Sequence, residues 1–156
     1  MPTENVMQRF LSIVFTLCLL TGCASTVECH LTDDDFEVSS QEEIEQWYEQ
    51  YKGCENDPNV SSDILFSLAL LIGWAEIDGY PANRPVHIYD LVYRAAKLGN
   101  REALIGLADF YDIGFKEAGI DPNNEVSLCL DGLADIAPVG DADFSLPVSR
   151  CLVLAD

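Results

Sequence analysis

The sequence predicts an all-α domain built as a short solenoid of antiparallel helix pairs, and three observations support this fold class. Five consecutive segments carry apolar side chains at helical spacing, and glycine or proline separates the segments. Two segments also echo each other, because Ile72-Gly73 followed by Gly79 matches Leu107-Ala108 followed by Gly114, 35 residues later. A fixed period near this length is typical of repeated helix pairs.

The chain begins with a segment typical of an export signal. Arg9 is followed by an uncharged, mostly apolar run over residues 10–20, and then by the small residues Thr21 and Gly22. A helix over that run would span only about 16 Å, too short for the ~30 Å hydrocarbon core of a membrane. We therefore expect residues 1–22 to be a signal peptide that is cleaved.

The next feature is the tetrapeptide Leu20-Thr21-Gly22-Cys23, which resembles the lipobox of bacterial lipoproteins. The resemblance implies that Cys23 receives lipid and becomes the first residue of the mature protein. The alternative is an ordinary secretory signal, cut near Ala24 or Ser25. By resemblance to Gram-negative lipoproteins, the non-acidic Ala24 implies a lipid anchor in the outer membrane, facing the periplasm. Several acyl chains would hold the protein there, since each buried CH₂ contributes about 0.8 kcal/mol.

Charge and composition restrict the class of partner. The chain has 27 acidic and 8 basic residues, and its formal net charge is −19. This excess repels phosphates, which argues against nucleic acid and anionic lipid head groups as partners. It favours a protein with a basic surface, although the charge could instead only keep an exported domain soluble. We expect no cofactor, no metal and no small-molecule substrate.

Four cysteines remain in the mature chain besides Cys23, and an oxidising periplasm favours disulfides between them. Four cysteines permit three pairings. Closeness in sequence favours Cys29 with Cys54 and Cys129 with Cys151. Each bond would tie a terminal segment to the body and contribute about 3 kcal/mol in the chain-entropy model. A zinc site is disfavoured because no Cys-x-x-Cys pair is present.

The beginning and the end of the helical pattern predict three parts of the mature chain. Residues 23–38 form a lipidated acidic tether, whose aspartates 33–35 lack the other ligands of a calcium loop. Residues 39–137 form the helical domain. Residues 138–156 form a C-terminal tail packed on the domain, in which residues 144–154 fit either a short helix or an extended segment.

Two helices open the predicted domain. Ser40 and Glu43 form a capping-box signature at the start of the first, which should end near Gly53. Its apolar and aromatic side chains recur at helical spacing: Ile44, Trp47, Tyr48 and Tyr51. Either of two adjacent serines can cap a second helix over residues 61–78. Because residues 64–72 are almost all apolar, this helix should be buried on several sides, at the centre of the domain.

Three further helices follow. Prolines precede the third, residues 86–98, and Gly99 ends it. The fourth covers residues 101–113 and begins directly after Asn100. The fifth begins after a proline and one of two asparagines and covers about residues 124–137.

The segment 95–103 (Ala-Ala-Lys-Leu-Gly-Asn-Arg-Glu-Ala), continuing to Gly114, resembles the Sel-one-like repeat family, a relative of the tetratricopeptide repeat. The family's small packing residues correspond to Ala95, Ala96, Gly99, Ala103 and Ala108, and Tyr111 matches a packing aromatic. Larger side chains there would widen the distance between helices. The resemblance covers roughly residues 65–136. It implies stacked helix pairs with an elongated concave face that binds proteins.

Acidic and aromatic side chains on this face are the candidate partner contacts. They are Asp109 and Asp112 on the fourth helix, Glu76 and Asp78 on its counterpart, and the aromatic residues Trp74 and Tyr80. The alternative is that the acidic residues are merely solvated and the aromatic residues pack in the core.

The sequence does not indicate an enzyme. The histidines, His30 and His87, have no catalytic motif around them. We expect a membrane-anchored envelope scaffold or adaptor that binds another protein. The alternative is an immunity lipoprotein that neutralises a basic secreted toxin or hydrolase.

Overall fold

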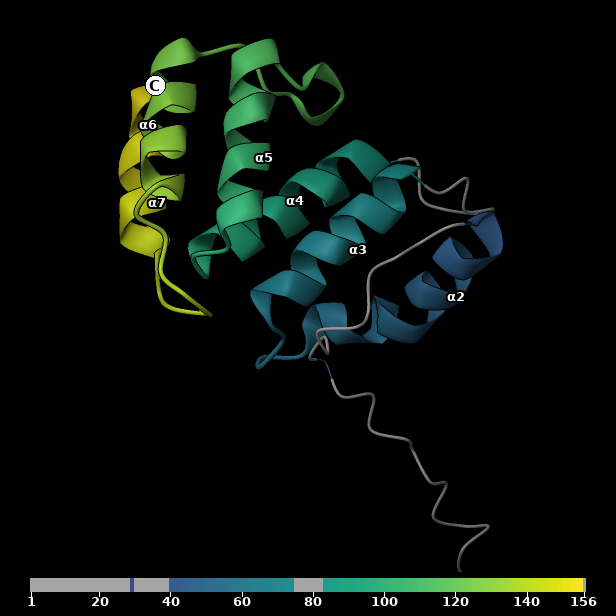
Figure 1. Ribbon diagram of the computed structural model, residues 1–156. Coiled ribbons are helices and arrows are strands. Elements are labelled where there is room, and N and C mark those ends of the chain that lie inside the picture. The colour runs from purple at the N-terminus through teal and green to yellow at the C-terminus, as the bar shows by residue number, and fades with distance from the viewer. Residues whose placement is uncertain (1–28, 30–39, 75–82, 156) are drawn as a thin grey trace, which may run out of the picture.

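The computed structural model describes residues 29, 40–74 and 83–155. These residues form six α-helices (Figure 1): α2 (Gln41–Tyr51), α3 (Ser62–Trp74), α4 (Arg84–Lys97), α5 (Arg101–Ile113), α6 (Asn124–Ala134) and α7 (Ser145–Leu152). Three short 3-10 helices accompany them: η1 (Lys52–Asn56) follows α2, η2 (Lys116–Ala118) follows α5, and η3 (Val153–Ala155) follows α7. The all-α class is confirmed. The expected signal peptide, Cys23 and nearly all of the tether lie outside the described residues.

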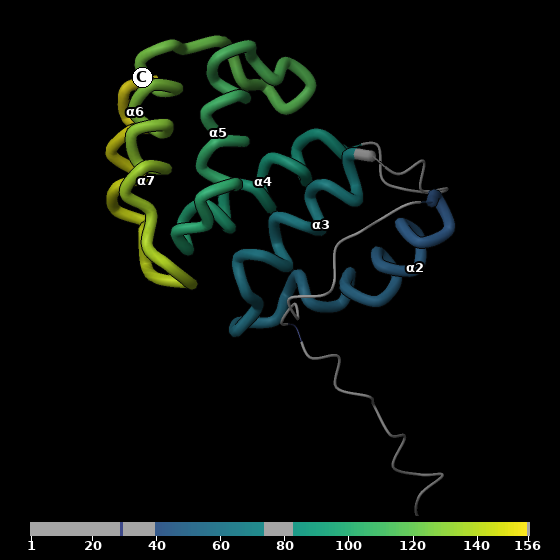
Figure 2. Tube along the Cα trace, in the orientation of Figure 1, coloured from purple at the N-terminus to yellow at the C-terminus, as the bar shows by residue number. Residues whose placement is uncertain are grey.

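The helices pack in the order in which they occur along the chain. Each of α2 to α6 contacts the next, and α7 packs on both α6 and α4. Figures 1 and 2 show this succession from α2 at one end to the α6–α7 pair at the other. Helix α4 therefore contacts α3, α5 and α7, and it shares the centre of the domain with α3.

The capping box at the start of α2 is present as predicted. Ser40 Oγ accepts a hydrogen bond from the Glu43 backbone N–H at 3.3 Å, and Glu43 Oε2 accepts one from the Ser40 N–H at 3.1 Å. The α-helix ends at Tyr51, and the chain continues through Gly53 as the 3-10 helix η1.

Helix α3 is buried on several sides, as its apolar sequence predicts. Five of its large aliphatic side chains are almost fully buried: Ile64, Leu65, Leu68, Leu71 and Ile72. At its start, Ser61 Oγ accepts a hydrogen bond from the Ile64 N–H at 3.3 Å. The described part of α3 ends at Trp74, and the predicted continuation to Asp78 lies outside the described residues.

The turn between α4 and α5 follows directly from the local sequence. The N–H groups of Gly99 and Asn100 donate to the carbonyls of Ala96 and Ala95, which is the hydrogen-bond pattern of a Schellman motif. Gly99 has φ +84°, a conformation that favours glycine. Asn100 then caps α5, since its Oδ1 accepts from the Ala103 N–H at 2.8 Å. The four alanines of the repeat-like segment are buried in the core: Ala95, Ala96, Ala103 and Ala108.

The C-terminal part contains a helix where the sequence fits either a helix or an extended segment, and it forms hydrogen bonds with the end of α4. Asn123 caps α6, which ends at Ala134 rather than near Ala137. Residues 145–152 form α7, so the tail contains a helix. The segment before α7 binds the α4–α5 turn: the N–H of Ala142 donates to the Leu98 carbonyl, and the N–H of Phe144 donates to the Lys97 carbonyl.

Candidate partner-binding groove

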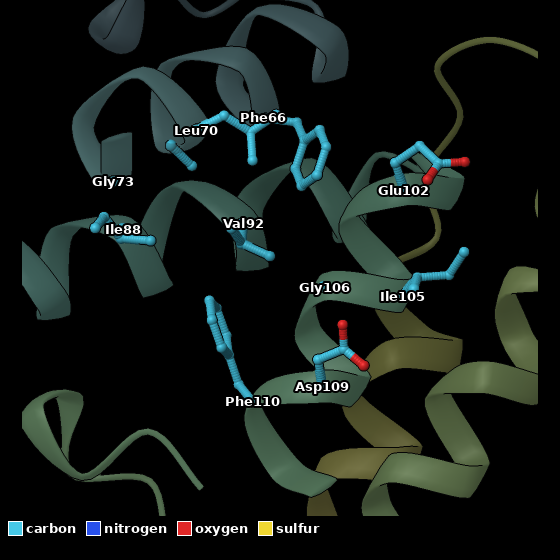
Figure 3. Close-up of a pocket in the computed structure, with 11 residues that line it drawn as sticks. Phe66, Leu70, Gly73, Ile88, Val92, Glu102, Ile105, Gly106, Asp109 and Phe110 are labelled. Atoms are coloured by element: carbon cyan, nitrogen blue, oxygen red, sulfur yellow. The ribbon is translucent and has the colours of Figure 1, made fainter. Parts of the chain in front are cut away.

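A groove of about 390 Å³ lies between α3 and α5, with α4 as its floor. In Figure 3, Phe66 and Phe110 stand on opposite sides of it, and Val92 lies between them. The groove is lined by Phe66, Ala69, Leu70 and Gly73 from α3, Ile88 and Val92 from α4, and Glu102, Ile105, Gly106, Asp109 and Phe110 from α5. Most of these groups are apolar.

The two walls of the groove have the same spacing. Residues 66, 69, 70 and 73 line it from α3, and residues 102, 105, 106 and 109 line it from α5. Both sets follow the pattern i, i+3, i+4, i+7, which places them on one face of a helix. Each residue of the α5 set follows its α3 counterpart by 36 positions, from Phe66 to Glu102 and from Gly73 to Asp109.

The charged residues that line the groove are both acidic. Glu102 and Asp109 are exposed on α5, and no basic residue is among the eleven that line the groove. Seven residues separate the two carboxylates, which corresponds to about 10.5 Å along the helix axis. Arg101 lies 3.3 Å from Glu102, but an exposed pair of this kind contributes little. The groove therefore combines an apolar floor with a negative edge.

The wall formed by Phe110 is supported by other aromatic rings. The Phe110 ring lies 4.6 Å from the Phe115 ring and 6.2 Å from the Tyr89 ring, measured between centroids. The hydroxyl groups of Tyr89 and Tyr111 are 3.1 Å apart. Burial is the main reason that the pKa of Tyr89 lies far above its usual range, and the hydrogen bond with Tyr111 raises it further. This tyrosine therefore stays neutral. These ring contacts hold Phe110 in place.

The structure brings one of the six predicted partner contacts into the groove, namely Asp109. Asp112 is exposed on α5 but does not line the groove. Trp74 is the last described residue of α3 and directly follows the lining residue Gly73. The other three predicted contacts lie outside the described residues: Glu76, Asp78 and Tyr80.

Most of the groove is not indicated by the sequence, although Gly106, a glycine inside a helix, is a local sign of it. A glycine inside a helix is about 1 kcal/mol less favourable than alanine. A Cβ built on Gly106 would lie 3.6 Å from the nearest Phe66 atom and 3.8 Å from the nearest Val92 atom, which is ordinary contact. The packing of this domain therefore does not require a glycine at position 106.

Two disulfides join the pairs that closeness in sequence favours. Cys29 is bonded to Cys54 in η1, and Cys129 in α6 is bonded to Cys151 in α7, each with Cα atoms 5.5 Å apart. All four cysteines are thus engaged in disulfides. Within the described part of the chain, no group of His, Cys, Asp and Glu side chains is arranged to hold a metal ion.

His87 participates in a cluster that connects η1 with α4. Its Nε2 lies 2.9 Å from Glu55 Oε1, and Arg94 donates a hydrogen bond from Nη2 to the Glu55 carbonyl at 2.5 Å. None of these three residues lines the groove. Among the described helices, none is long and apolar enough to span a bilayer.

The groove must be interpreted from its own chemistry. No protein-family model, curated protein or solved structure matches this chain.

Proposed function

We propose that this protein is a lipoprotein held in the outer membrane, facing the periplasm, and that its acidic helical domain binds another protein as an envelope scaffold or adaptor. The observation that carries the proposal is the apolar groove between α3 and α5, whose only charged lining residues are Glu102 and Asp109. An apolar surface with a negative edge suits a partner that presents apolar and basic side chains together.

The matching walls of the groove support a repeat architecture of the Sel-one-like kind. In this proposal, α3 and α4 form one helix pair, and α5 and α6 form the next. The first helix of each pair then contributes one face to the groove, at an offset of 36 residues, which is one more than the 35 residues that relate Gly79 to Gly114. The proposed binding surface is thus the concave side of a short solenoid.

The proposed lipid at Cys23 would hold the domain close to the membrane. The disulfide at Cys29 joins the expected tether to the body at Cys54, and residues 24–28 separate this disulfide from Cys23 in the sequence. Six residue steps from Cys23 to Cys29 reach at most about 20 Å. A partner of this domain would therefore meet it within a short distance of the membrane surface.

Photo-crosslinking in the native cell tests the groove as the binding site. Benzoylphenylalanine replaces Asp109 in the groove, or Asp131 as the control, in otherwise full-length chains. Both positions are exposed aspartates, and Asp131 lies on α6 outside the groove. We expect one protein adduct with the probe at position 109 and none with the probe at 131. Adding Gly106→Leu, which fills the groove, should remove the adduct.

The adduct also assigns the partner class. A resident envelope protein supports the adaptor role, whereas a basic secreted toxin or hydrolase would replace it with the immunity role. Equal adducts from both probes, or none from either, would contradict groove binding. For the anchor, Cys23→Ser should shift the protein from the membrane fraction to the soluble fraction, and an unchanged distribution would refute the lipidated cysteine.

A further inference from the structure

Gly106 is a residue of the groove that the packing of the chain does not require to be glycine. Helix α5 runs without interruption through this position, although glycine is less favourable there than alanine. The neighbouring atoms leave room for a methyl group. A glycine that the chain's own packing does not need allows another backbone or side chain to approach the helix closely.

The residues around Gly106 form a regular pattern along α5. The pattern has positions i, i+3, i+4 and i+7, occupied by Glu102, Ile105, Gly106 and Asp109. An acidic residue therefore stands at each end, with an isoleucine and a glycine between them. A helix packed along α5 would meet this pattern with its own stripe of the same spacing.

We propose that the groove receives an amphipathic helix of the partner, lying along α5 and in close contact at Gly106. Its basic side chains at i and i+7 pair with Glu102 and Asp109, and its apolar side chains at i+3 and i+4 enter the groove. This inference rests on the proposed function, since it specifies which element of the partner protein binds.

The distance between the two carboxylates favours a helix over a β-strand. Two side chains seven residues apart on a helix lie on one face and about 10.5 Å apart, which equals the separation of Glu102 and Asp109 along α5. An extended strand covers a similar distance in three residues, but its side chains at i and i+3 point to opposite faces. A strand therefore has no pair of same-face positions at this spacing.

Synthetic peptides test the inference with the mature protein in detergent. The first is a side-chain-stapled, alanine-rich helix with Lys at i and i+7 and Leu at i+3 and i+4. The second has the same composition, but its second Lys stands at i+5, on the other face. The third is a proline-rich peptide with Lys at i and i+3, which lie on one face of a polyproline helix about 9 Å apart.

We expect only the first peptide to bind strongly, as measured by fluorescence anisotropy. Glu102→Gln and Asp109→Asn should each weaken its binding about two- to fivefold, the range for exposed ion pairs, whereas Asp112→Asn should leave it unchanged. Equal binding of the first two peptides, preference for the third, or no binding of the first would overturn the inference.

A pair of glycine variants separates binding from folding. Gly106→Ala should raise the thermal midpoint by roughly 2–4 °C and weaken binding of the first peptide about fivefold or more, because the added methyl group occupies the contact. The control is Gly132→Ala on α6, where a Cβ would meet no atom within 4 Å. This variant should be similarly stabilised and bind normally.

The inference and the proposed function fail in different ways. If Gly106→Ala is stabilised but binds the first peptide as well as the original protein does, the close helix contact is wrong. If the crosslinked adduct at position 109 nevertheless persists, the groove still binds a protein partner, in another conformation. If the adduct is also absent, the proposed function itself is refuted.

Discussion

Two glycines of the α4–α5 hairpin occupy regions with opposite requirements. In the turn, Gly99 has φ +84°, and a Cβ there would lie 2.6 Å from Pro138 Cγ. In the groove, Gly106 is part of a regular helix, and its Cβ would meet Phe66 at an ordinary 3.6 Å. The fold explains the first glycine completely. It does not require the second, which lines the groove.

The turn and the groove also differ in their contacts with the C-terminal tail. The tail packs Pro138 against Gly99, and its backbone donates hydrogen bonds to Leu98 and Lys97 at the end of α4. It also caps α3, since both carboxylate oxygens of Asp141 accept from the Ser62 N–H. No described residue of the tail lines the groove. The described part of the tail thus packs against the turn and does not enter the groove.

The largest expected effect is on the turn. Gly99→Ala should destabilise the domain by about 3 kcal/mol, because a left-handed conformation costs a non-glycine residue about 1–2 kcal/mol and the contact with Pro138 adds to it. Urea denaturation followed by circular dichroism measures the change. A loss below about 1 kcal/mol would show that the turn adapts.

The double variant Gly99→Ala with Pro138→Ala sharpens this test. Removal of the proline ring relieves the close contact but not the backbone strain, so the double variant should recover only part of the lost stability. Full recovery would show that φ at position 99 is unimportant. Gly106→Ala changes stability in the opposite direction, and this contrast in sign is the clearest measure of the difference between the two regions.

The next largest effect concerns the cap that joins the tail to α3. Asp141→Ala removes acceptors for the N–H and hydroxyl of Ser62, whose side chain is buried. The expected loss is about 1–2 kcal/mol, the range for a helix cap and an unsatisfied buried group. Denaturation of Asp112→Ala, which removes the same charge from an exposed site on α5, is the control and should change little.

An unaltered stability of Asp141→Ala would mean that water replaces the carboxylate at Ser62. Peptide binding in the groove should be unchanged in either case, because neither Asp141 nor Ser62 lines it. A large loss of binding would instead couple the tail to the groove and weaken the distinction between the two regions.

Local signals predicted the helices well, because their causes lie within a few residues. The capping box of Ser40, the turn at Gly99 and Asn100, and the cap at Asn123 all depend on partners at most five positions away. The tail was ambiguous because its helix is short. Its start is fixed partly by bonds from Ala142 and Phe144 to the distant end of α4.

The groove was harder to predict, because it depends on contacts between distant residues. The sequence indicated Asp109, but nothing local shows that Phe66 and Gly106 meet across α4. Similarly, Asp141 reaches Ser62 from 79 residues away. A charge pattern identifies exposed carboxylates, whereas only the packing of helices shows which of them border an apolar surface.

The smallest expected effect is a pH dependence at the start of α7. Hydrogen bonds from the side chain and the backbone N–H of Ser145 hold the pKa of Asp143 below its usual range, and Lys97 acts in the same direction. A carboxylate with a lowered folded-state pKa contributes stability above its unfolded pKa, and the contribution is lost as pH falls through the folded-state pKa. The stability difference between the original protein and Asp143→Asn should therefore be present at neutral pH and shrink in acid. Because Asp143 is fully exposed, this difference in stability should be the smallest of the series. Urea midpoints of the two proteins, determined at neutral pH and again in acid, measure it. A difference that is independent of pH would show that the Asn variant loses the geometry of the cap rather than its charge.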